Sequence, residues 1–118
     1  MPRALLLENI HPLAVNVLAD AGYDVTTAKG ALDEDELILA LEGVSLLGIR
    51  SKTQVSDAVL AASDLDAIGA FCIGVNQIDL ASAASHGVAV FNAPFSSTRS
   101  VVELAVGEII ALTRRRTV

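Results

Sequence analysis

Two basic side chains, Arg50 and Lys52, are the residues of this sequence best placed to bind a ligand. They directly follow an apolar run, in a chain that has only 8 lysines and arginines and a formal net charge of −6. Arginine offers a carboxylate or phosphate a planar fork of donors, and lysine offers a mobile point charge. Ile73 and Gly74 follow a second apolar run and can donate backbone N–H groups. This pattern predicts a site that captures a small anion.

A plainer interpretation of each feature stays open at this point. Arg50 and Lys52 can serve only to balance surface carboxylates, and Gly74 can mark an ordinary tight turn. His11 precedes a helix pattern and His86 lies near the end of another, so both are interpreted as structural. Without knowledge of any family, the residues predict an anion-binding domain that lacks its own catalytic acid or base.

Strand and helix patterns alternate along the chain five times, and this alternation places the candidate donors together. Runs of strand length lie at residues 4–7, 23–27, 44–49, 66–71 and 88–91. Helix patterns lie between them, at residues 12–22, 33–43, 56–62 and 80–85. The alternation predicts an α/β fold, a flavodoxin-like doubly wound parallel sheet of five strands in the order 2-1-3-4-5. Ligands of such sheets bind at the carboxyl ends of the strands, where the loops at 8–11, 50–53, 72–77 and 92–97 are expected to meet.

Composition limits the class of protein. The 118 residues are 53% hydrophobic and 19% charged, which is typical of one folded domain. The acidic balance argues against nucleic acid, and no apolar run is long enough for a membrane span. The single cysteine, Cys72, ends a buried run, so we expect it in the core of a cytoplasmic protein. The sequence contains no G-x-G-x-x-G loop, metal-ligand cluster or nucleophile elbow.

Three motifs in order resemble the amino-terminal part of the D-isomer-specific 2-hydroxyacid dehydrogenases. They are GIRSKT at 48–53, AIGAFCIGVNQ at 67–77, and FNAPFS at 91–96 followed by TRSV at 98–101 and Glu103. The similarity runs from residue 4 to about residue 113 and is to members that oxidise 3-phosphoglycerate, a phosphorylated hydroxy acid, with NAD in serine biosynthesis. It implies a substrate-binding domain in which basic side chains hold the substrate's phosphate or carboxylate and two backbone amides hold its carboxylate. The implied substrate-binding residues are Arg50, Ser51, Lys52, Ile73, Gly74 and Ser97.

The resemblance also implies boundaries and limits. Residues 1–98 correspond to an incomplete substrate-binding domain, and 99–118 to an inter-domain helix and the truncated start of the nucleotide-binding domain. The family's glycine-rich loop and its catalytic arginine, glutamate and histidine lie beyond the matching region. The chain alone is therefore expected to bind no NAD tightly and to catalyse no hydride transfer. The alternative is a stand-alone anion-binding or interaction module derived from the dehydrogenase.

Two departures from the family pattern and one apolar helix complete the expectations. Ser97 stands where asparagine is usual and is too short to reach the same partner, while Val102 replaces alanine and adds bulk. The helix pattern at 101–112 is apolar nearly all round, which predicts that it is buried on every side. We expect a homo-oligomer, most simply a two-fold dimer, with this helix at the interface.

Overall fold

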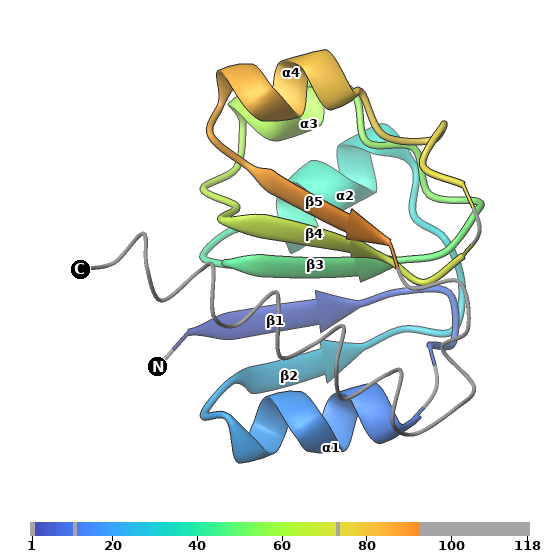
Figure 1. The fold of residues 1–118 in the computed structure, drawn as a ribbon, viewed down its shortest axis with the longest axis vertical. Coiled ribbons are helices and arrows are strands. Elements are labelled where there is room, and N and C mark those ends of the chain that lie inside the picture. Colours follow the sequence, from blue (N-terminus) through green and yellow to red (C-terminus); the bar gives the residue numbers. More distant parts are fainter. Residues whose placement is uncertain (1, 11, 73, 93–118) are drawn as a thin grey trace.

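The computed structural model describes residues 2–10, 12–72 and 74–92, where strands alternate with helices (Figure 1). The elements are β1 (Arg3–Leu6), α1 (Pro12–Asp20), β2 (Asp24–Thr27), α2 (Glu34–Ala40), β3 (Leu46–Ile49), α3 (Asp57–Ala61), β4 (Ala67–Ala70), α4 (Leu80–Ser85) and β5 (Ala89–Asn92). The strands form one parallel sheet in the order β2-β1-β3-β4-β5. The predicted fold class and strand order are confirmed. The helix predicted at 101–112 and the domain boundary at residue 98 lie outside the described residues.

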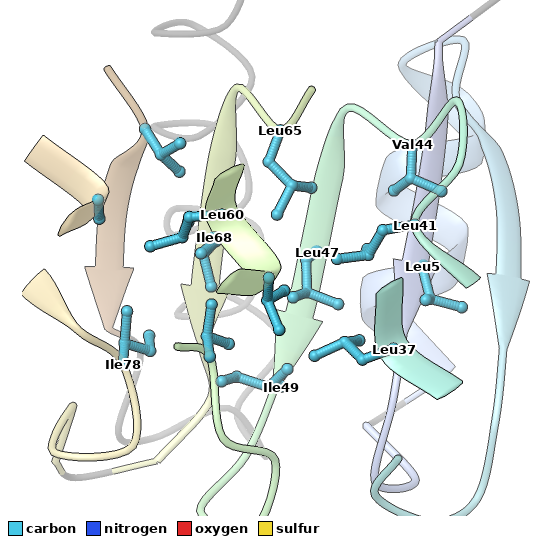
Figure 2. Close-up of a cluster of buried hydrophobic side chains, with 14 of the residues drawn as sticks. Leu5, Leu37, Leu41, Val44, Leu47, Ile49, Leu60, Leu65, Ile68 and Ile78 are labelled. Atoms are coloured by element: carbon cyan, nitrogen blue, oxygen red, sulfur yellow. The ribbon is translucent and has the colours of Figure 1, made fainter. Parts of the chain in front are cut away.

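The two faces of the sheet carry different layers because side chains alternate along each strand. Leu5, Leu47 and Ile68 point to one face, where they pack in the larger core beneath α2, α3 and α4 (Figure 2). Leu6 and Leu46 point to the other face and belong to a second cluster with residues of α1. Helices on both faces are what a doubly wound parallel sheet requires.

Local chemistry explains where several helices begin and end. Asp33 caps α2 by accepting a hydrogen bond from the Glu36 N–H at 2.9 Å, and the Glu36 carboxylate accepts one from the Asp33 N–H. Gly22 and Gly87 follow α1 and α4 with φ of 96° and 71°, a left-handed conformation that glycine adopts without strain. None of the helices in the described part of the chain has the length and apolarity needed to cross a bilayer.

The strand order reverses between β1 and β3, and this point sets the location of the site. Leu6 of β1 pairs with Gly48 of β3 on one side and with Thr27 of β2 on the other. The approach is close at Gly48, where an added Cβ would lie 2.5 Å from the Leu6 side chain. The loops that follow β1, β2 and β3 therefore emerge side by side at the carboxyl edge of the sheet.

Candidate anion-binding site

An open pocket of about 330 Å³ lies at the carboxyl ends of β1, β2 and β3. It is lined by Glu8, Lys29, Gly30, Ala31, Arg50, Ser51 and Lys52. Arg50, Ser51 and Lys52, which the sequence placed in the site, thus share one cavity of a size that suits small ligands. We call it the anion pocket below. Of the other predicted site residues, Ile73 and Ser97 lie outside the described residues, and Gly74 lies in the loop after β4.

Glu8 is the residue around which the loop after β3 is folded. Its side-chain Oε2 accepts hydrogen bonds from the backbone N–H groups of Arg50 at 2.8 Å and Thr53 at 3.1 Å, and its Oε1 accepts one from Lys52 at 2.8 Å. Glu8 is only 8% exposed, whereas the Arg50 and Lys52 side chains are exposed. The amides of this loop point inward to Glu8, so a ligand in the anion pocket meets the loop's side chains.

The protonation of Glu8 follows from these contacts. Burial raises the pKa of its carboxyl, but the hydrogen bonds from Arg50, Lys52 and Thr53 outweigh burial and hold the pKa below its ordinary value of 4.5. Glu8 is therefore an ionised carboxylate at neutral pH. The Thr53 hydroxyl is buried beside the carboxylate and helps to lower this pKa, although it makes no hydrogen bond of ordinary geometry among the described residues.

Lys29 is a pocket residue that sequence reasoning missed. It lies in the loop after β2, which is tied to the loop after β1 by two backbone hydrogen bonds, Glu8 N–H to Gly30 O at 3.3 Å and Asn9 N–H to Ala28 O at 3.2 Å. The signal was available, because every strand of a parallel sheet ends at the same edge. Lys29 follows the second strand pattern, so it is expected at the same edge of the sheet as Arg50. Three cations and one carboxylate thus surround the pocket.

Gln77 joins the loop after β4 to the loop after β3. Its Nε2 donates to Arg50 O at 2.8 Å and to Gly74 O at 3.3 Å, and the side chain is 8% exposed. Cys72 was expected in the core. It is partly buried and packs against the larger core, and its thiol donates to Gly74 O at 3.0 Å and accepts from Gln77 at 3.3 Å. The apolar run before Cys72 did not indicate that its thiol forms hydrogen bonds within the loop after β4.

Among the described residues, no histidine or cysteine lines the anion pocket, and its one carboxylate, that of Glu8, already accepts three backbone N–H groups. The His86 ring lies 3.3 Å from the Asp57 carboxylate, linking the end of α4 to the start of α3. Within the described ranges, histidine, cysteine and carboxylate groups form no cluster of three or more that could hold a metal ion. What the arrangement offers chemically is positive charge at fixed positions, which is suited to binding an anion.

Comparison with known proteins agrees with this architecture. Residues 4–116 match the D-isomer specific 2-hydroxyacid dehydrogenase family, catalytic domain. D-3-phosphoglycerate dehydrogenase 2 of Saccharomyces cerevisiae is 53% identical over 112 residues, which are 94% of this chain and 24% of the yeast protein. D-3-phosphoglycerate dehydrogenase of Escherichia coli is 48% identical over 112 residues, 93% of this chain and 27% of that enzyme. The chain spans about a quarter of the length of these curated relatives and matches their amino-terminal region.

Solved structures give the same fold. A Vibrio cholerae phosphoglycerate oxidoreductase is 26% identical with a TM-score of 0.65, over 80% of this chain and 31% of that one. An NAD+-bound 3-phosphoglycerate dehydrogenase of Entamoeba histolytica is 17% identical with a TM-score of 0.67, over 80% and 33% of the two chains. The second likeness concerns the fold alone. Matched over nearly all its length and close in sequence to two curated enzymes, this chain belongs to the D-isomer-specific 2-hydroxyacid dehydrogenases.

Proposed function

We propose that this chain is the substrate-binding portion of a NAD-dependent D-3-phosphoglycerate dehydrogenase, which oxidises 3-phosphoglycerate to 3-phosphohydroxypyruvate. The observation that carries the proposal is the convergence of Lys29, Arg50 and Lys52 on one pocket in a chain of net charge −6. 3-Phosphoglycerate carries a phosphate and a carboxylate, and both are groups that arginine and lysine bind well. The names of the yeast and bacterial relatives support the same substrate.

The roles of the site residues follow from their positions. Lys29, Arg50 and Lys52 hold one anionic end of the substrate, and Ser51 adds a hydroxyl at the same pocket. The amides at Ile73 and Gly74 hold the substrate carboxylate, as the family resemblance implies. Ser97 stays a predicted contact at the position of the family's longer asparagine. A Cβ added at Gly74 would meet nothing nearer than Asn76 Oδ1 at 3.9 Å, beyond its chain neighbours. The described residues thus leave room for a ligand beside this backbone.

Cofactor, assembly and location complete the proposal. NAD+ accepts the hydride in the intact enzymes, and the residues of this chain bind and orient the substrate for that step. We assign tight NAD binding to the remainder of such an enzyme, because this sequence has no glycine-rich dinucleotide loop. Assembly as a homo-oligomer through residues 101–112 stays a prediction from their apolar sequence. We also infer a cytoplasmic location, supported by the single cysteine.

The direct test is a titration of the isotope-labelled 118-residue chain with 3-phosphoglycerate, followed by amide NMR shifts. We expect shifts at residues 29–31 and 50–52, with millimolar affinity, or about −4 kcal/mol, because a pocket this open does not exclude water. Arg50→Ala should abolish them. The matched control is Arg3→Ala, which removes the same side chain from the opposite end of β1. Absence of shifts, or shifts confined to another surface, would contradict the proposal.

A further inference from the structure

A negative charge at an anion-binding pocket calls for an explanation. Glu8 lines the same pocket as Lys29, Arg50 and Lys52, and its carboxylate is repelled by any anion that enters. If Glu8 contributed only its negative charge, it would lower the affinity of the pocket for anions. The contacts of Glu8 therefore have to account for its presence.

Glu8 is the one residue in the described part of the chain that holds both cation-bearing loops. Its carboxylate accepts hydrogen bonds from the backbone N–H groups of Arg50, Lys52 and Thr53, which fix the loop after β3 at three residues. Its own backbone N–H donates to Gly30 O, next to Lys29, in the loop after β2. Side chain and backbone together therefore set the separation between Lys29 and the Arg50–Lys52 pair.

The backbone at Glu8 supports a requirement for this particular side chain. Its φ is 64°, in the left-handed region that side chains other than glycine, asparagine and aspartate rarely adopt. Asn9, which follows, has φ of 56°. Glycine would fit the backbone at position 8 with less strain but would leave three inward-pointing amides without an acceptor.

We propose that Glu8 is a positioning residue for anion binding, which holds the loops of Lys29 and of Arg50–Lys52 so that their cations converge on one ligand. This inference rests on the proposed function, since it concerns the same pocket. Glu8 acts through the two loops and does not itself bind the anion. The amides of Arg50, Lys52 and Thr53 are occupied by Glu8, so the ligand must be held by side chains in this part of the site.

The direction in which Glu8→Gln changes the affinity for anions tests the inference. Glu8→Gln has nearly the same shape but removes the negative charge, so Coulomb's law alone predicts that anions bind more tightly. Positioning predicts the reverse, because an amide NH2 group placed against backbone N–H groups releases the loop after β3. The direction of the change in affinity separates the two accounts.

The experiment compares binding of 3-phosphoglycerate to the wild-type chain, Glu8→Gln, Glu8→Asp and Leu65→Ala by amide NMR. Leu65 is buried beneath α3 ahead of β4, away from the pocket, so its truncation destabilises the fold without touching the site. We expect affinity to fall about tenfold in Glu8→Gln, to recover in part in Glu8→Asp, and to change less than about twofold in Leu65→Ala. Equal or tighter binding by a folded Glu8→Gln would overturn the inference and leave the proposed function intact. No binding by the wild type would overturn both.

If Glu8→Gln does not fold, the wild-type chain supplies the test through pH. Sulfate keeps its charge over the pH range in which a carboxylate titrates. Gln77, which faces this loop from the loop after β4, is neutral. Sulfate affinity should fall as pH drops through the pKa of Glu8, which lies below 4.5, in step with the amide shifts of the loop after β3. Affinity that rises as those amides titrate would overturn the inference.

Discussion

The loops after β3 and after β4 lie at the same edge of the sheet and are held in opposite ways. The loop after β3 is fixed through its donors, because the N–H groups of residues 50, 52 and 53 end on the Glu8 carboxylate. The loop after β4 is fixed through its acceptors. Gly74 O accepts from the Cys72 thiol and from Gln77, and Cys72 O accepts from Asn92 Nδ2 at 3.0 Å. The loop after β3 is thus folded around the Glu8 carboxylate, and the loop after β4 around the donors of Cys72 and Gln77.

From this difference we infer two modes of anion recognition at the same edge of the sheet. Where the backbone amides are occupied, as after β3, the ligand meets the exposed side chains of Arg50 and Lys52. Where the loop is held through its carbonyl oxygens, as after β4, we propose that the amide of Gly74 serves the ligand, together with that of Ile73, which lies outside the described residues. Gln77 links the two loops, because its Nε2 donates hydrogen bonds to both Arg50 O and Gly74 O. Cationic side chains strengthen the attraction for an anion, and backbone amides orient it.

The largest effect on stability is expected from Glu8→Gln. It replaces a buried acceptor of three charge-assisted hydrogen bonds, and each such bond contributes about 1.5–3 kcal/mol, so we expect a loss of about 2–4 kcal/mol after relaxation. The folded-state pKa of Glu8 lies below its ordinary value of 4.5. The stability contributed by ionisation is therefore present above pH 4.5 and is lost as pH falls through the folded pKa.

Urea unfolding of wild type and variant at several pH values measures this difference. Glu36→Gln is the matched control, because Glu36 also accepts a backbone N–H but does so on an exposed helix end. A gap between wild type and Glu8→Gln that stays constant from neutral to acid pH would contradict the assignment of the charge to the loop after β3.

A smaller effect is expected from Gln77→Leu. The change leaves Arg50 O without its 2.8 Å donor and releases Gly74 O, so we expect a loss of about 1–2 kcal/mol. Hydrogen exchange should quicken in both loops, whereas Glu8→Gln should affect the loop after β3 first. Gln54→Leu makes the same chemical change at an exposed position and should stay within about 0.5 kcal/mol of wild type. Faster exchange confined to one loop would argue that Gln77 does not link them.

The strand order and the helix positions could be predicted because they depend on local, periodic signals. Apolar runs of strand length, the carboxylates at residues 33–36 and glycines past helix ends determine elements wherever they occur. The loop that carries Arg50, Ser51 and Lys52 could be placed at the carboxyl edge of the sheet because a parallel sheet gathers its loops there. The role of Glu8 could not, because its partners lie more than 40 positions away in the sequence. Glutamate after an apolar run also looks like any surface carboxylate.

The smallest effect is expected from Thr53→Val. The Thr53 hydroxyl is buried near the Glu8 carboxylate but makes no hydrogen bond of ordinary geometry among the described residues, so the isosteric change should lie within about 1 kcal/mol of neutral. The Thr53 N–H bond to Glu8 is unaffected by the substitution. Thermal unfolding measures the result. A loss above about 2 kcal/mol would mean that the hydroxyl also bonds to the carboxylate, and that Glu8 is held by more than backbone donors.

The central claim is that this chain supplies the substrate site of a phosphoglycerate dehydrogenase. It is tested most directly by a chimera in which residues 4–116 replace the matching segment of the Escherichia coli enzyme, which is 48% identical to this chain over 112 residues. We predict that the chimera forms NADH from 3-phosphoglycerate, that Arg50→Ala lowers kcat/KM by about 100-fold or more, and that Arg3→Ala changes it less than about twofold. A folded chimera that binds NAD+ but does not turn over 3-phosphoglycerate, or one that is indifferent to Arg50→Ala, would contradict the account.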